Sequence, residues 1–213
     1  MPPLPDRHDG ARDPLPSDPD GAASGLPDPP APELDPYLDA AARCFARHGI
    51  SRTRVPDIAD ELGVSRVTVY RRAGNVDAMA RLLLARELHL IVDGLPEVIA
   101  EHEGPQVVVA VVESVLAQAL HHPVLVKVLT DDAEIIGPLL TQALPTLIER
   151  AVAGAAPLLE AAMASGEIAR RDAHALAEWL VRLTITLVLA PPQGDLRELL
   201  EQLLIPALSP EAP

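Results

Sequence analysis

The chain has 213 residues, of which 48% are hydrophobic and 2% aromatic, and a formal net charge of −14 at pH 7. Its single cysteine, Cys44, excludes an internal disulfide and a cysteine-based metal cluster. We expect a soluble, cytoplasmic protein without membrane contact, because no basic start precedes an apolar leader and the apolar runs are too short to span a bilayer.

The charge is distributed unevenly along the chain. Residues 1–34 carry a net charge of −5 and residues 91–213 carry −11, whereas residues 35–90 carry +2. All nine basic residues of this middle segment are arginines. A local basic surface on an acidic protein is typical of a module that contacts phosphate groups, and a solvated helical surface is the alternative.

The composition divides the chain into three parts. Residues 1–34 hold ten of the 23 prolines and few aliphatic residues, so we expect a disordered tail. Residues 35–90 show four helical patterns, which open at Asp35, near Thr53, at Ser65 and at Asn75. Residues 91–213 are helical throughout, so the fold class is all-α, with a small three-helix head joined by a fourth helix to a larger body.

The stretch DIADELGVSRVTVYRR, residues 57–72, has the pattern of a helix-turn-helix. Gly63 allows the positive φ of the turn, and Val64 and Val69 are expected to point inward. The side chains left on the ends and outer face of the third helix are Ser65, Arg66, Val67, Thr68, Tyr70, Arg71 and Arg72. Hydroxyl and guanidinium groups donate to phosphate oxygens, and arginine also reads guanine.

Two leucine stripes lie in the last part of the chain. They are expected on the helices of residues 172–189 and 195–208 and comprise Leu176, Leu180, Leu183 and Leu187, then Leu196, Leu199, Leu200 and Leu203. Two such stripes on neighbouring helices predict a homodimer through an intersubunit four-helix bundle. The alternative is that both stripes are buried within one subunit.

Residues 36–90, which include an alanine-rich first helix and the core T-x-x-x-DIA-x-x-LGVS-x-x-T-x-Y, resemble the DNA-binding domain of the tetracycline-repressor (TetR) family. The resemblance implies a homodimer that binds a palindromic double-stranded DNA operator. It also implies a ligand-responsive transcriptional regulator, for which repression is favoured over activation. It implies base contacts by Arg66, Val67 and Thr68. It also implies phosphate contacts by Tyr70 and by Thr53 or Arg54.

The body has few polar groups that could fix a ligand. A pocket near Trp179, Leu183 and Leu116 would be aliphatic, which favours a small apolar effector, and a filled core is the alternative. We expect no catalytic residues, cofactor or metal, because no nucleophile–base, phosphate-loop or metal-ligand pattern is found. The rival function is a helical protein-interaction module whose DNA-binding head has degenerated.

Overall fold

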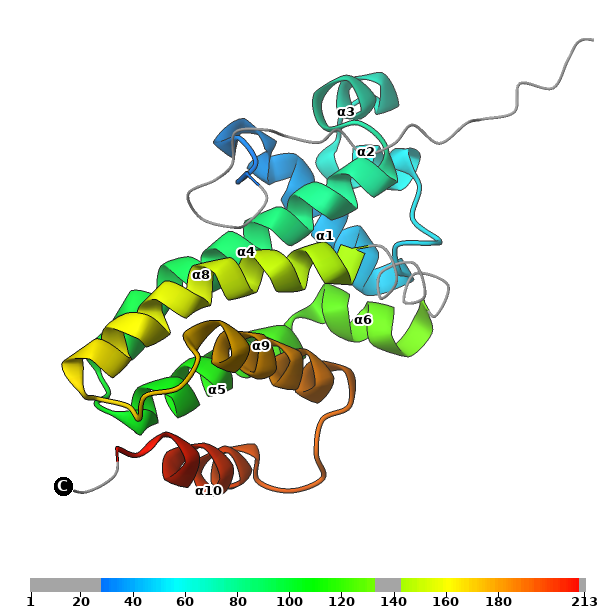
Figure 1. Ribbon diagram of the computed structural model, residues 1–213. Coiled ribbons are helices and arrows are strands. Elements are labelled where there is room, and N and C mark those ends of the chain that lie inside the picture. Colours follow the sequence, from blue (N-terminus) through cyan, green and yellow to red (C-terminus); the bar gives the residue numbers. More distant parts are fainter. Residues whose placement is uncertain (1–27, 133–142, 211–213) are drawn as a thin grey trace, which may run out of the picture.

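The computed structural model describes residues 28–132 and 143–210, in which every regular element is a helix (Figure 1). The described elements are η1 (Pro32–Leu34), α1 (Asp35–His48), α2 (Val55–Leu62), α3 (Arg66–Ala73), α4 (Val76–Ala100), α5 (Pro105–His121), α6 (Pro123–Asp131), α8 (Leu144–Ser165), α9 (Ala173–Leu189) and α10 (Leu196–Leu208). The all-α class is confirmed.

The head consists of α1, α2, α3 and the first half of α4, and it has its own core. Phe45, Leu38 and Ile58 are fully buried there, and Val69 and Met79 close the core from α3 and α4. Burial of these side chains provides the main favourable free energy for such a small unit.

Polar side chains fix where α3 and α4 begin. The Ser65 hydroxyl accepts a hydrogen bond from the backbone N–H of Thr68 at 3.2 Å, and the Asn75 side chain accepts one from Ala78 N–H at 2.8 Å. Each satisfies one backbone donor that the first helical turn leaves free. Gly63 ends α2 with φ of 68°, as expected for the turn.

Two expectations for the head are wrong. Val64 is 39% exposed, because it precedes the Ser65 cap and so lies outside the inward spacing of α3, which Val69 and Ala73 define. Residues 32–34, expected in the disordered tail, form η1, whose Leu34 packs against the head core. Residues 1–27 lie outside the described residues.

The body is built from α5, α8, α9 and α10. Its core includes the fully buried Leu116 of α5 together with Leu200 and Leu204 of α10. In this core α8 packs along α9, and α10 packs on α5 (Figure 1). Leucine, valine, isoleucine, alanine and one methionine make up the buried cluster, so its lining is aliphatic.

The helix α6 lies in the sequence of the body but packs on the head. Val124 and Val128 are buried in the head core, and α6 lies against α1. After α5 the chain thus comes back to the head as α6, and the remaining helices of the body, α8, α9 and α10, follow later in the sequence. The contact of α6 with α1 therefore connects the chain of the body to the head.

Among the described helices none is, by itself, long and apolar enough to cross a membrane. The pair α5 and α6 passes that test jointly by length and composition only, and a bend of 68° separates the two helices.

Candidate nucleic-acid interface

The helix α3 presents one buried and one open face. Val69 and Ala73, four residues apart, are 0% and 4% exposed and hold α3 against the head core. On the opposite side Val67 is 67% exposed and Tyr70 63% exposed. Because these side chains are held on a capped helix, their positions are set by the packing of α3 rather than by a loop.

The structure brings several of the expected DNA-contacting residues together around one depression, here called the α2–α3 hollow. Its lining consists of Val55, Pro56, Arg66, Val67, Tyr70 and Arg71. Val55 and Pro56 belong to the first turn of α2 and were not predicted as site residues. The crossing of α2 and α3 brings them beside Val67, and the family resemblance, which places Pro56 at the edge of the groove, is the one signal that could have pointed to this turn.

The remaining expected residues lie around this surface. Arg54 is exposed just before α2, and Arg72 is exposed near the end of α3. Ser65 is exposed at the start of α3, with its hydroxyl 2.9 Å from that of the half-buried Thr68. Ser65 therefore positions α3 through its cap, whatever it contacts in a complex.

Thr53 is not on this surface, which corrects the expectation of a phosphate contact there. It is 5% exposed, and its hydroxyl donates a hydrogen bond to the carbonyl oxygen of Gly49 at 2.6 Å. The buried hydroxyl is satisfied inside the turn between α1 and α2, where a phosphate group cannot approach it. Of the two alternatives at the start of α2, only Arg54 is accessible.

The nine arginines of the head divide into two groups. Four of them form ion pairs that hold helices together: Arg43 and Arg47 with Glu61, Arg52 with Asp131, and Arg86 with Asp35, Asp39 and Glu87. Within the described part of the chain, Arg54, Arg66, Arg71, Arg72 and Arg81 form no ion pair. Four of these five lie at the α2–α3 surface, so its guanidinium groups are available to anions.

Glu61 connects α2 with α1. Its carboxylate accepts a hydrogen bond from Arg43 Nε at 2.7 Å and another from Arg47 Nη2. These hydrogen bonds, together with the two positive charges, lower the pKa of the Glu61 carboxyl. Arg43 and Arg47 of α1 thereby hold α2, the first helix of the helix-turn-helix, in position.

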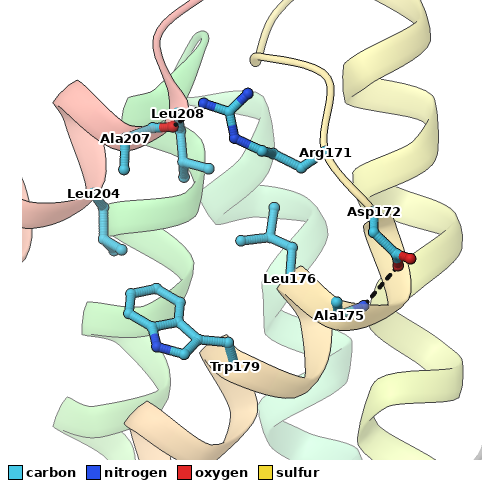
Figure 2. Close-up of a pocket in the computed structure, with 8 residues that line it drawn as sticks. All are labelled: Arg171, Asp172, Ala175, Leu176, Trp179, Leu204, Ala207 and Leu208. Atoms are coloured by element: carbon cyan, nitrogen blue, oxygen red, sulfur yellow. Dashed lines mark hydrogen bonds between the residues drawn. The ribbon is translucent and has the colours of Figure 1, made fainter.

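The predicted ligand residues do not share one cavity in the described residues. Leu116 is fully buried in the body core, and Leu183 packs against that core. Trp179 is 49% exposed and lies in a separate depression between α9 and α10 (Figure 2). The lining of this α9–α10 hollow consists of Arg171, Asp172, Ala175, Leu176, Trp179, Leu204, Ala207 and Leu208.

The predicted dimer residues divide in the same way. Leu180, Leu187 and Leu200 are at most 9% exposed and belong to the core of their own subunit, which corrects their assignment to an interface. Leu203 is 53% exposed, whereas Leu176, Leu183, Leu196 and Leu199 are half-buried. The stripes are wider than one packing face, because leucines at i, i+3 and i+4 cover an arc of the helix that the body only partly buries.

Comparisons with known proteins agree with this geometry. Residues 38–83 match the family described as bacterial regulatory proteins, tetR family. An uncharacterized HTH-type transcriptional regulator of Mycobacterium tuberculosis is 29% identical over 140 residues, which are 66% of this chain and 71% of that protein.

Solved structures share the fold, AlkX and FadR among them. The TetR family repressor AlkX from Dietzia sp., implicated in biodegradation of n-alkanes, is 23% identical with a TM-score of 0.60, over 81% of this chain and 94% of AlkX. The fatty acid degradation regulator FadR from Bacillus halodurans is 18% identical with a TM-score of 0.60, over 82% of this chain and 94% of FadR.

A capped, arginine-bearing α3 on a helix-turn-helix head, attached to a helical body, defines the class of helix-turn-helix DNA-binding regulators. Residues 38–83 thus form a tetR-type DNA-binding domain, and over 81% of its length the chain has the fold of the TetR family repressor AlkX.

Proposed function

We propose that the protein is a cytoplasmic repressor that binds a palindromic DNA operator as a homodimer and is released by a small apolar effector. The observation that carries the proposal is the exposed face of α3, where Arg66 and Arg71 form no ion pair within the described residues and flank the exposed Val67. An accessible basic face on an otherwise acidic chain favours the binding of an anionic partner at this face, and the DNA backbone is the natural candidate.

The proposed contacts follow from the position of each side chain. Arg66, Val67 and Thr68, in the first turn of α3, meet base edges in the major groove. Tyr70 donates its hydroxyl to a phosphate group. The other phosphate contacts are assigned to Arg54, Ser65, Arg71 and Arg72. Thr53 is left out because it is buried.

The proposed dimer face is the open side of α9 and α10. Leu203 at 53% exposed and Trp179 at 49% exposed are large apolar side chains that water contacts in one subunit. Pairing α9 and α10 with their two-fold copies covers both, and half-buried Leu199 adds to the seam. The same symmetry sets two α3 helices about 34–36 Å apart, the distance between successive major grooves on one side of the duplex.

The proposed effector is apolar because the body offers aliphatic surface. Within the described residues, the buried cluster around Leu116 is made of leucine, valine, isoleucine, alanine and one methionine. AlkX is implicated in biodegradation of n-alkanes and FadR is a regulator of fatty acid degradation, which supports the same class of ligand here. Leu116 and Leu183 remain the proposed lining, whereas Trp179 is reassigned to the dimer face.

The first experiment tests DNA binding with the full chain. Duplexes are selected from a random pool, and the affinity for the selected sequence is measured by fluorescence anisotropy between about 50 and 300 mM salt. We expect a palindromic sequence and an affinity that falls with salt by about one log unit per log unit of salt for each phosphate contact. Failure to select any sequence, or binding that ignores salt, would contradict the proposal.

The second experiment tests the effector. The DNA complex is titrated with saturated fatty acids and n-alkanes of increasing length, and with a flat polycyclic cation as the control. We expect release by the aliphatic compounds and none by the cation, because aliphatic walls lack the faces that attract cations. Release by the cation alone would contradict an aliphatic effector site.

A further inference from the structure

The lining of the α2–α3 hollow combines apolar and basic side chains. Val55 and Pro56 from α2 and Val67 from α3 contribute the apolar side chains, and Arg66 and Arg71 contribute the charges. A surface that serves only to attract phosphate groups has no use for three apolar side chains from two helices beside its arginines.

Val67 is strongly exposed. At 67% exposed it belongs to neither core cluster of the described residues, and the helix of which it is part is otherwise polar on this side. A singly exposed valine is common on protein surfaces. Here, however, Val67 shares a depression with Val55 and Pro56, so an apolar group that entered the hollow would contact all three.

The major groove offers one apolar group on its base edges, the C5-methyl group of thymine. The other edges carry amino donors or carbonyl and ring-nitrogen acceptors, which would lose water against valine and proline without gaining a hydrogen bond. Cytosine differs in a second way, since it has a hydrogen at C5 and leaves the hollow unfilled.

We propose that the α2–α3 hollow binds the C5-methyl group of one thymine in each operator half-site, and that Val67 determines this preference. The inference rests on the proposed function, since it assumes that α3 lies in the major groove. Arg66, one residue before Val67, then reads a guanine near that thymine through its O6 and N7 atoms. Tyr70 and Arg71, three and four residues after Val67, hold the flanking backbone.

The test removes the methyl group without changing any hydrogen-bonding atom of the base. In the selected operator, each thymine of a half-site is replaced in turn by deoxyuridine, with the symmetric replacement in the other half-site. We expect one position at which the affinity of the full chain falls by about fourfold for each methyl group, or on the order of fifteenfold for both half-sites. The other positions should change much less.

The variant Val67→Ala connects that loss with the hollow. It should bind the thymine and deoxyuridine operators with nearly equal affinity, because the side chain that contacts the methyl group has been removed. Val64→Ala is the matched control: Val64 is 39% exposed, also lies next to α3 and does not line the hollow. This variant should keep the full difference between the two operators, and both variants should keep the parent's helical circular dichroism.

The outcomes separate this inference from the proposed function. Equal affinity for every thymine and deoxyuridine pair in the parent would overturn the methyl site and leave operator binding intact. The same holds if Val67→Ala keeps the parent's difference between the two operators. Failure of the chain to select any DNA would overturn both proposals together.

Discussion

The Asp132 carboxylate, at the end of α6, accepts a hydrogen bond from the backbone N–H of Ile50 at 2.6 Å. Asp132 is 4% exposed, and Ile50 lies in the turn between α1 and α2, 82 positions earlier in the chain. This bond joins the turn between α1 and α2 of the head to α6, the helix that follows the first helix of the body. The turn and the end of α6 thus hold each other in position.

Replacing Gly49 with alanine should destabilise the head. Gly49 has φ of 83° and ψ of 162°, a backbone conformation that is open almost only to glycine, and an added Cβ atom would collide with the Asp132 carboxylate. We expect the free energy of unfolding to fall by about 1–3 kcal/mol from backbone strain, with a further loss from the displaced carboxylate. Urea unfolding followed by circular dichroism measures the change.

Gly63→Ala is the control for that prediction. Gly63 also has a positive φ, 68°, but a Cβ atom there would meet nothing within 4 Å. Only the backbone penalty of about 1 kcal/mol should appear. Equal losses in the two variants would show that the contact with Asp132 has no energetic weight.

Replacing Asp132 with alanine should leave the partly buried Ile50 N–H without its acceptor. The expected loss is about 1–3 kcal/mol of unfolding free energy, the usual cost of such an unsatisfied donor. Asp131→Ala is the matched control one residue earlier: Asp131 is exposed and pairs with Arg52 at 3.9 Å and with Lys127. A far smaller change is expected there, because water screens exposed ion pairs. If both variants unfold at the same urea concentration, the bond to Ile50 contributes nothing.

The ion pairs of Glu61 should make the head sensitive to acid. Arg43 and Arg47 lower the pKa of Glu61 in the folded state, so the unfolded chain binds a proton more readily than the folded one. The contribution is therefore fully present above the ordinary glutamate pKa of about 4.3 and is lost as the pH falls through the lowered folded value. Glu61→Gln should make the acid limb of the stability curve shallower, measured by thermal unfolding between pH 6 and about pH 2.5. An unchanged limb would be inconsistent with this role.

Replacing Arg66 with alanine should weaken the selected operator by about 1–3 kcal/mol and relax the sequence preference at one position of each half-site. Tyr70→Phe is the comparison, because loss of a phosphate donor should weaken all DNA sequences about equally. Both changes are on the exposed face of α3, so neither should alter unfolding. Anisotropy with the selected and a scrambled duplex measures the two ratios. Unchanged operator affinity in the Arg66 variant would remove this residue from the reading surface.

Replacing Leu199 and Leu203 together with glutamate should give monomers. Leu203 is 53% exposed and Leu199 is half-buried, so the charges enter the proposed seam more than the core of the subunit. Sedimentation velocity should show half the parent's mass, and operator binding should be lost while the helical content stays. Leu90→Glu is the control, since Leu90 is 55% exposed on α4, away from α9 and α10. A parent protein that is monomeric at micromolar concentration would refute the dimer.

Several features of this protein follow from the sequence alone. Helix periodicity and local chemistry were sufficient to predict where helices of the head begin and end. Ser65 and Asn75 cap the helices that they were expected to cap, and Gly63 has the positive φ that the turn requires. These features are determined within a few residues of the chain, because a cap or a turn is satisfied by its own neighbours. The fold class and the type of the DNA-binding domain could therefore be predicted.

Other features depended on how the helices pack. The sequence shows that the head has nine arginines but not which of them are paired. The packing of α1, α2, α4 and α6 determines that ion pairs are formed by Arg43, Arg47, Arg52 and Arg86. The same packing leaves Arg66 and Arg71 accessible. The burial of Thr53 and the gathering of Val55 and Pro56 beside Val67 were settled in the same way.

Packing also determines that Leu200 of α10 is buried whereas Leu203 is exposed, and that α6 lies against the head. A repeating pattern gives the face of a helix but not the neighbour that will cover it. That neighbour is chosen by contacts between residues far apart in the chain, whose combined burial outweighs any local preference.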